Sequence, residues 1–329
     1  MYGLLLLTIA LPVWAWGPHT EVTQAGLDAL APNDPIVVRL GPQFQRLSFY
    51  CWMGDYQGSL MDEPDRSQYY ADDYLLFPKV PKHVSHLSPD VNQILEPYFR
   101  RAVQALRTET RLNAARWIGT LLHFTEDAGA PPHALGVLGD THFGMENWID
   151  KTQIKLDAYT PQLLGSNENE ALTGYLRRMD GLSAYAKAVG EKTKPLVEAN
   201  RRSEVEPLSL ECAEENSRVV ADILHTLGAI GLKDTPDSAI LRGTINPFGD
   251  HKMSAKVYLD GTDYTTITGP DGRYEFHNIP PGAYRGRYWS PGFRTRGFYV
   301  ILSKGDNRVL NVTLPHQPRT GRNLHPSAE

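Results

Sequence analysis

The chain has 329 residues, of which 41% are hydrophobic and 22% are charged, and its formal net charge is −5. This composition is typical of a globular protein, and the length suffices for one large domain and one small domain. The acidic balance excludes a broad basic field that would hold nucleic acid by neutralising its phosphates. We therefore expect no stable nucleic-acid complex, and a phosphate-bearing substrate would have to be bound locally.

Residues 1–15 predict a signal peptide. The short apolar run MYGLLLLTIALP is followed by Val13 and Ala15, small residues of the kind that signal peptidase prefers at positions −3 and −1. The run is too short to span a bilayer, and an uncleaved anchor is the less favoured alternative. Cleavage after Ala15 would leave Trp16 as the first residue of a secreted, periplasmic or cell-surface protein.

Residues 16–232 are expected to form an all-α helical bundle. From about Asp34 onward, apolar residues recur at three- and four-residue steps, for instance in NAARWIGTLLHFTEDAG and ECAEENSRVVADILHTLGAIGL. The long Pro-, Asp- and Tyr-rich segment DYQGSLMDEPDRSQYYADDYLLFPKVPKHVSHLSPD interrupts this pattern, and its length favours a functional loop over a passive linker. We expect this segment to form one wall of a site.

Residues 239–314 are expected to form a small all-β sandwich. Short alternating runs such as AKVYLDG and RYEFHN are separated by the turns GPDG, IPPG and KGDN. The polar, Pro-rich residues 315–329 are expected to be disordered. The predicted fold class is thus a multidomain chain, with a helical bundle followed by a small all-β sandwich.

The segment LLHFTEDAGAPPHALGVLGDTHFGMENWID holds the densest group of chemically active side chains. His123 and Asp127 are four residues apart, as are His142 and Glu146, and four-residue spacing places both members of a pair on one helix face. His133 stands between the two pairs, after a Pro-Pro turn. Imidazole nitrogens and carboxylate oxygens are ordinary zinc ligands. One such pair can arise by chance, but five of these residues so close together predict a metal centre.

The first pair is expected to point into the interior of the bundle. Ala115 and Gly119 precede His123 and Asp127 at four-residue steps on the same stripe. These small residues would let another helix pack closely just below the two polar groups. A carboxylate buried there would need a metal or another partner to compensate its charge.

These motifs, together with WGPH after the expected cleavage site, resemble the zinc-dependent phospholipase C family and its relatives, the single-strand-specific nucleases. In that family a processed N-terminal Trp binds zinc through its α-amine and carbonyl, with a His nearby. The resemblance therefore assigns Trp16 and His19 as ligands. An α-amine has an ordinary pKa of about 7.7–8.0, so it can bind metal near neutral pH once the preceding peptide bond is cut. Signal cleavage would then also complete the metal site.

The resemblance further implies three Zn²⁺ ions per chain. It assigns His123 and Asp127 as ligands, with Asp127 bridging two ions. It assigns His133, His142 and Glu146 to another ion.

One Asp and one His are implied as ligands from the loop before the His123 helix. His86 in SHLSPD matches the family segment better than its rival His83. Asp55 in CWMGDY follows a helix directly, whereas Asp73 in YYADDY stands at a more family-like distance from His86. Asp55 is preferred because the end of a helix fixes a ligand better than a long loop does.

The implied reaction is phosphodiester hydrolysis, in which a metal-bound hydroxide attacks phosphorus. Asp55 would be the catalytic residue that orients the water or accepts its proton. His142 and Glu146 match the phospholipase pattern, whereas the nucleases usually have Asp in place of Glu. A phospholipid substrate is therefore preferred over another phosphodiester, and a single-strand nuclease or 3′-nucleotidase is the alternative. A non-catalytic, zinc-stabilised surface-binding protein is the alternative of another class.

The pattern T-x-x-D-G-x-Y-x-F followed by I-P-P-G-x-Y, from Thr268 to Tyr284, resembles the carboxypeptidase regulatory-like, transthyretin-type β-sandwich. Asp271 and Gly272 predict a tight turn, and the aromatic residues after it alternate into a core. Five further aromatic residues are expected to fill the sandwich core: Tyr288, Trp289, Phe293, Phe298 and Tyr299. The alternative is that they form an exposed patch that contacts a surface or polymer.

The two cysteines, Cys51 and Cys212, are too few for a disulfide scaffold. An exported protein could pair them, and the sequence does not decide between a disulfide and two thiols.

Overall fold

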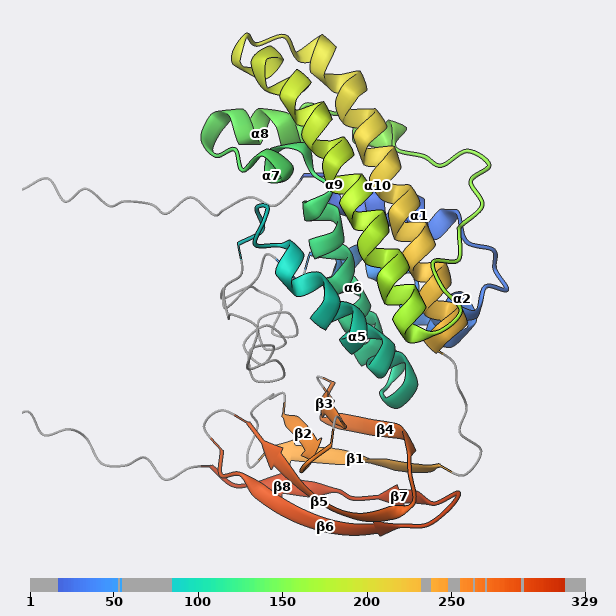
Figure 1. Ribbon diagram of the computed structural model, residues 1–329. Coiled ribbons are helices and arrows are strands. Elements are labelled where there is room, and N and C mark those ends of the chain that lie inside the picture. The colour runs from blue at the N-terminus through green and yellow to red at the C-terminus, as the bar shows by residue number, and fades with distance from the viewer. Residues whose placement is uncertain are drawn as a thin grey trace, which may run out of the picture.

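The computed structural model describes residues 17–52, 54, 85–231, 238–247, 255–262, 264–269, 271–290 and 293–316. Within these residues a helical domain is followed by a β domain (Figure 1), which confirms the predicted fold class. The expected signal peptide, Trp16 and most of the long segment before His86 lie outside the described residues, as does the chain after residue 316.

Helices make up the first domain. Its elements are α1 (His19–Asp28), α2 (Pro35–Leu40), η1 (Gly41–Gln43), α3 (Leu47–Tyr50), α5 (Asn92–Thr108), α6 (Arg111–Ala128), α7 (Pro131–Leu135), α8 (Gly139–Asn147), η3 (Lys151–Gln153), α9 (Glu168–Glu198) and α10 (Arg202–Gly231). The long helices α9 and α10 lie against one another along one side of the domain (Figure 1). Among the described helices, none is long and apolar enough to cross a bilayer.

Side-chain caps fix where several helices begin. Thr110 accepts a hydrogen bond from the Asn113 N–H at the start of α6, and Asn167 accepts one from the Glu170 N–H at the start of α9. Asp34 caps α2, where Pro35 follows as the first helical residue. Each cap satisfies a backbone donor that has no partner inside its helix.

Helix α6 is the centre of the helical core. Every residue of α6 from Asn113 to Ala128 is buried, and α5, α3 and α10 pack around it. At Gly119 an added Cβ would lie 2.4 Å from the Tyr50 Cβ, so only glycine allows α3 to approach this closely. The expected small-residue stripe therefore has the packing role that the sequence predicts.

Two sheets form the β domain. Its strands are β1 (Ala239–Pro247), β2 (Lys256–Leu259), β3 (Thr265–Ile267), β4 (Arg273–Ile279), β5 (Gly282–Trp289), β6 (Arg296–Leu302), β7 (Asn307–Val309) and β8 (Val312–Leu314). One sheet has the order β4-β1-β7, with β8 also paired to β1, and the other has the order β3-β2-β5-β6. Apolar side chains of both sheets form a core separate from the helical one.

The turn before β4 forms as the sequence predicts. Gly272 adopts a φ of +73°, and its N–H donates to the Gly269 carbonyl at 2.9 Å. The Asp271 carboxylate accepts from the Arg273 N–H at 3.0 Å. After this turn Tyr274 and Phe276 are both buried in the sandwich core.

A buried polar network joins the two domains. Arg101 of α5 forms an ion pair with Glu109, and its guanidinium also donates to the Thr265 carbonyl of β3 at 3.1 Å. The Thr266 hydroxyl donates to the Glu109 carboxylate at 2.8 Å. Ile267 packs in the helical core rather than in the sandwich core. Strand β3 therefore lies against the α5 and α6 end of the helical domain (Figure 1), and β4 also contacts α5.

Replacing Glu109 by Ala should destabilise the protein strongly. The change leaves the Arg101 cation buried without its carboxylate, and breaking a buried pair in this way costs about 3–5 kcal/mol. Urea unfolding of Glu109→Ala should show this loss, whereas Glu204→Ala, which breaks the exposed pair with Arg201, should cost about 0–1 kcal/mol. Equal effects of the two variants would contradict the proposed importance of this network.

Candidate metal centre

Asp127, near the C-terminal end of α6, is the residue around which the site is arranged. Its Oδ2 atom lies 2.6 Å from His86 Nδ1 and 3.1 Å from His123 Nε2. Its Oδ1 atom lies 3.3 Å from His19 Nε2 and 3.5 Å from His133 Nδ1. Four histidines from separate elements thus meet one buried carboxylate.

A second group lies next to the first. Glu146 Oε1 is 2.9 Å from the Nε2 atoms of both His133 and His142. Helix α7 supplies His133 directly after Pro131 and Pro132, and it ends at Gly136 with a φ of +65°. This left-handed residue lets the chain turn into α8, where His142 and Glu146 share a face as their spacing predicts.

Main-chain carbonyls fix the tautomers of three of these histidines. Nδ1 of His123 lies 2.7 Å from the Cys51 carbonyl. Nδ1 of His133 lies 2.9 Å from the His86 carbonyl, and Nδ1 of His142 lies 2.8 Å from the Val137 carbonyl. A carbonyl only accepts hydrogen bonds, so Nδ1 carries the proton in each ring. In the neutral ring the lone pair is then on Nε2.

With these tautomers, acceptor atoms of the imidazoles and carboxylates face one another, so the site requires a cation or a proton between them. The Nε2 atoms of these three rings face the carboxylate oxygens of Asp127 and Glu146, which are acceptors as well. Two acceptors at about 3 Å repel one another unless a proton or a metal ion lies between them. Imidazole nitrogen and carboxylate oxygen suit zinc in ligand type.

Two carboxylate oxygens support the same interpretation. Asp127 Oδ1 and Glu146 Oε2 are buried and accept no hydrogen bond from any residue that the structure describes. A buried carboxylate oxygen without a donor is costly. Metal ions would satisfy both atoms, so the residues of the two groups (His19, His123 and Asp127; His133, His142 and Glu146) fit a metal centre.

Asp127 and His133 each shift the pKa of the other. Burial raises the pKa of the Asp127 carboxyl, but the three imidazoles around it outweigh burial and hold that pKa well below its usual value. Burial lowers the pKa of the His133 imidazole, but Asp127 and Glu146 outweigh burial and raise this pKa to about 8. In the absence of metal, a proton on an imidazole therefore takes the place of the missing cation.

One side of the centre is open to solvent. The side chains of His86 and His142 are 22% and 14% exposed, whereas those of His19, His123 and Asp127 are fully buried. His86 and His142 are therefore the histidines of the centre that solvent reaches most.

Several predicted site residues are placed by the structure, and others are not. His19, His86, His123 and Asp127 come together in one group, and His133, His142 and Glu146 form the adjoining one. Trp16 and Asp55 lie outside the described residues, as do the rivals Asp73 and His83.

Glu126 belongs to the site, although the ligand motifs do not single it out. Its Oε2 atom lies 2.5 Å from His19 Nδ1, and both side chains are fully buried. The two residues are 107 positions apart, so no spacing rule connects them. The one signal in the sequence is that Glu126 is a second acidic residue directly before Asp127. Without the structure, an acidic residue at that position would be assigned to the solvent-exposed face of the helix.

The positions of Cys51 and Cys212 decide whether they form a disulfide. Cys51 Sγ lies 3.2 Å from the Ser48 carbonyl, and Cys212 Sγ lies 3.5 Å from the Gly129 carbonyl. Both are buried thiols, and the two sulfurs do not form a disulfide.

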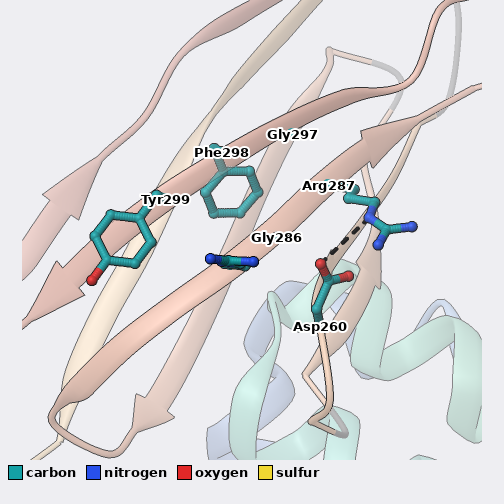
Figure 2. A pocket seen from close by; sticks show the side chains of 7 residues that line it. Asp260, Gly286, Arg287, Gly297, Phe298 and Tyr299 are labelled. Carbon is teal, nitrogen blue, oxygen red and sulfur yellow. Dashed lines mark ion pairs between the residues drawn. The ribbon is translucent and has the colours of Figure 1, made fainter.

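A shallow pocket on the β domain differs in character from the metal centre. Figure 2 shows Phe298 and Tyr299 on β6 beside Arg287 and Asp260, which form an ion pair at 3.4 Å. Tyr299 is 61% exposed, whereas Tyr288 and Phe293 are buried, so the aromatic residues of this domain divide between core and surface.

A family comparison identifies the β domain. Residues 241–315 match the model described as "Carboxypeptidase regulatory-like domain", which confirms the resemblance predicted for this part of the chain. A comparison with curated protein sequences gives no match.

Solved structures give more distant likenesses. Alpha-toxin from an avian strain of Clostridium perfringens aligns at 17% identity over 90% of this chain and 97% of the toxin, with a TM-score of 0.40. Alpha toxin from Clostridium absonum aligns at 14% identity over 89% of this chain and 98% of the toxin, with a TM-score of 0.46. The predicted resemblance to zinc-dependent phospholipases C thus recurs in this comparison.

A cohesin–X-dockerin complex of Acetivibrio cellulolyticus matches a smaller part. The identity is 20% and the TM-score 0.21, and the match covers 23% of this chain and 56% of that chain. The chain therefore spans little more than half the length of that structure.

The metal-free protein should lose stability as the pH rises. His133 has a pKa of about 8 in the folded protein and an ordinary value near 6.5 when unfolded. Its protonation contributes roughly 2 kcal/mol of stability below pH 6.5, and this contribution is lost as the pH rises through 8. Urea unfolding of chelator-treated protein at pH 6 and pH 9 measures this difference in the free energy of unfolding.

His133→Gln is the control for this pH dependence, because it removes the titrating group. In zinc-loaded protein the loss should be absent and stability should rise with pH, because the metal-bound ring is neutral in the folded state while the unfolded chain still binds a proton below about pH 6.5. A metal-free wild type whose stability does not change between pH 6 and 9 would contradict the raised pKa.

Proposed function

We propose that this chain is a zinc-dependent hydrolase of phosphodiesters, and that its substrates are phospholipids cleaved in the manner of a phospholipase C. The observation that carries the proposal is the set of imidazole Nε2 atoms facing the buried carboxylates of Asp127 and Glu146. Such a set needs cations, and clustered cations suit the chemistry of phosphodiesters.

The metal ligands follow from the two groups. His86, His123, Asp127 and His19 would hold metal on one side, and His133, His142 and Glu146 would hold it on the other. The family resemblance adds Trp16 and Asp55 and brings the proposed number of ions to three. When bound, Zn²⁺ polarises the phosphoryl oxygens and makes water a better nucleophile near neutral pH.

The residues of the chain have distinct tasks in this reaction. Asp127 faces histidines with each of its carboxylate oxygens, and by the family resemblance it would hold two ions together. The carbonyls of Cys51, His86 and Val137 orient the rings, which prevents ligand rearrangement during turnover. Asp55 is proposed as the residue that orients the attacking water or accepts its proton.

Phospholipid is preferred over nucleic acid for two reasons. The ligand pair His142 and Glu146 matches phospholipases, where the related nucleases usually have Asp. The net charge of −5 also gives nucleic acid no broad basic surface. A nuclease or 3′-nucleotidase with the same zinc cluster is the competing activity, and a zinc-stabilised binding protein without catalysis is the competing class.

The proposed location is outside the cytoplasm, after cleavage of residues 1–15. The β domain would then contact a surface or polymer, and Tyr299 and Ile301 on β6 are its exposed apolar side chains best placed for this role, at 61% and 60% exposure. Cleavage after Ala15 would also create the α-amine of Trp16 that the resemblance assigns to zinc.

Zinc content and hydrolysis should fail together in a ligand variant. We expect processed wild-type protein to carry about three zinc ions per chain, by the family resemblance, and to release diacylglycerol from phosphatidylcholine. His142→Ala should lose zinc and reduce hydrolysis. The reduction should exceed the 10–100-fold effect that is typical when a residue that only supports a metal ligand is removed. His225→Ala, which removes a histidine bonded to Asp34, should retain both zinc and activity.

The substrate is tested in the same samples. Cleavage of single-stranded DNA with intact lipid would favour the nuclease alternative. Zinc binding without hydrolysis of either substrate would favour the binding protein, and protein without zinc would overturn the metal centre itself.

A further inference from the structure

His19 is oriented differently from its neighbours. Three other histidines of the centre donate from Nδ1 to main-chain carbonyls, whereas His19 Nδ1 lies 2.5 Å from the carboxylate of Glu126. His19 Nε2 then faces Asp127 Oδ1 at 3.3 Å. The ring orientation at this position therefore depends on a side chain.

Glu126 is itself held from three directions. Its Oε2 atom contacts His19, and its Oε1 atom accepts from the Thr23 hydroxyl at 2.5 Å. His19 and Thr23 are one turn apart on α1, so a single face of α1 contacts both oxygens. The main-chain carbonyl of Glu126 accepts from the Asn216 side chain of α10 at 2.9 Å.

Glu126 and Asp127 are neighbours in sequence but point to different partners. Successive residues of a helix are rotated by about 100°, so Asp127 reaches the histidine cluster while Glu126 reaches α1. Both side chains are fully buried. Charge at this depth is costly unless it is paired, and the partner of Glu126 is the His19 imidazole.

We propose that Glu126 is a positioning residue for metal binding by His19. It keeps the proton of the imidazole on Nδ1 and holds the ring so that the lone pair of Nε2 is directed to a metal ion beside Asp127. A carboxylate in this position also makes the imidazole a stronger ligand. This inference rests on the proposed function, since it requires the metal centre.

A purely structural role makes a different prediction. An ion pair that only joins α1 to α6 would change the stability of the metal-free and zinc-loaded protein equally. A positioning role changes the affinity for zinc at one position and leaves the His133 group unaffected.

Three variants of the full processed protein separate these roles. Glu126→Gln keeps the shape and an acceptor for His19 but removes the charge, and Thr23→Val removes the hydroxyl that fixes Glu126 Oε1. Glu215→Gln is the matched control, because Glu215 is a carboxylate of the same domain that pairs with Arg178 and Arg218. Zinc per chain is measured by atomic emission after dialysis against a series of chelator-buffered Zn²⁺ concentrations, and folding is measured by circular dichroism.

We expect Glu126→Gln to lose about one zinc ion per chain at a free Zn²⁺ concentration 10–100-fold higher than wild type does. Thr23→Val should shift the same step in the same direction by a smaller factor. The remaining zinc and the whole curve of Glu215→Gln should follow wild type.

Other outcomes overturn the inference in distinguishable ways. Folded Glu126→Gln with a wild-type zinc curve, or with an equal loss of thermal stability in both metal states, would leave the proposed function intact and remove the role of Glu126. If Glu126→Gln does not fold, an unshifted curve of Thr23→Val overturns the inference instead. A wild type that binds no zinc would overturn the proposed function and this inference together.

Discussion

The contact of imidazole lone pairs with buried carboxylates is the constraint on which the helical domain depends. Asp127 and Glu146 are almost completely inaccessible to solvent, and each faces ring nitrogens that are themselves acceptors. A fold that assembled these atoms without a cation would bear a large electrostatic cost. The packing of α6, α7 and α8 is therefore intelligible only when the charge at their meeting point is balanced.

Helix α6 connects this centre to the rest of the molecule. Its C-terminal half holds His123 and Asp127, while Asn113 near its start bonds to Thr266 of the β domain at 3.1 Å. At about 1.5 Å per residue, a helix of this length extends roughly 27 Å. One buried element thus runs from the domain interface to the candidate metal centre, with the buried amide of Asn113 near its start and the buried carboxylate of Asp127 near its end.

Much of this arrangement is predictable from local patterns. Four-residue spacing placed His123 with Asp127 and His142 with Glu146, and the turn at Gly272 followed from its Asp-Gly pair, because these features depend on neighbouring residues alone. The contacts of Glu126 with His19 and of Glu109 with Thr266 were not predictable, since 107 and 157 residues separate the partners. The sequence left the pairing of Cys51 and Cys212 open, and packing of the two sulfurs against separate carbonyls resolved it.

The histidine rings are oriented by two kinds of group, and these differ in how mutation can affect them. The carbonyls that orient His123, His133 and His142 belong to the backbone, so no substitution at Cys51, His86 or Val137 removes them. At His19 the orienting group is instead the Glu126 side chain, which one codon can alter. Mutation can therefore reach the ring orientation of His19 through its partner residue, whereas the orientation of His123, His133 and His142 depends on groups that every residue carries.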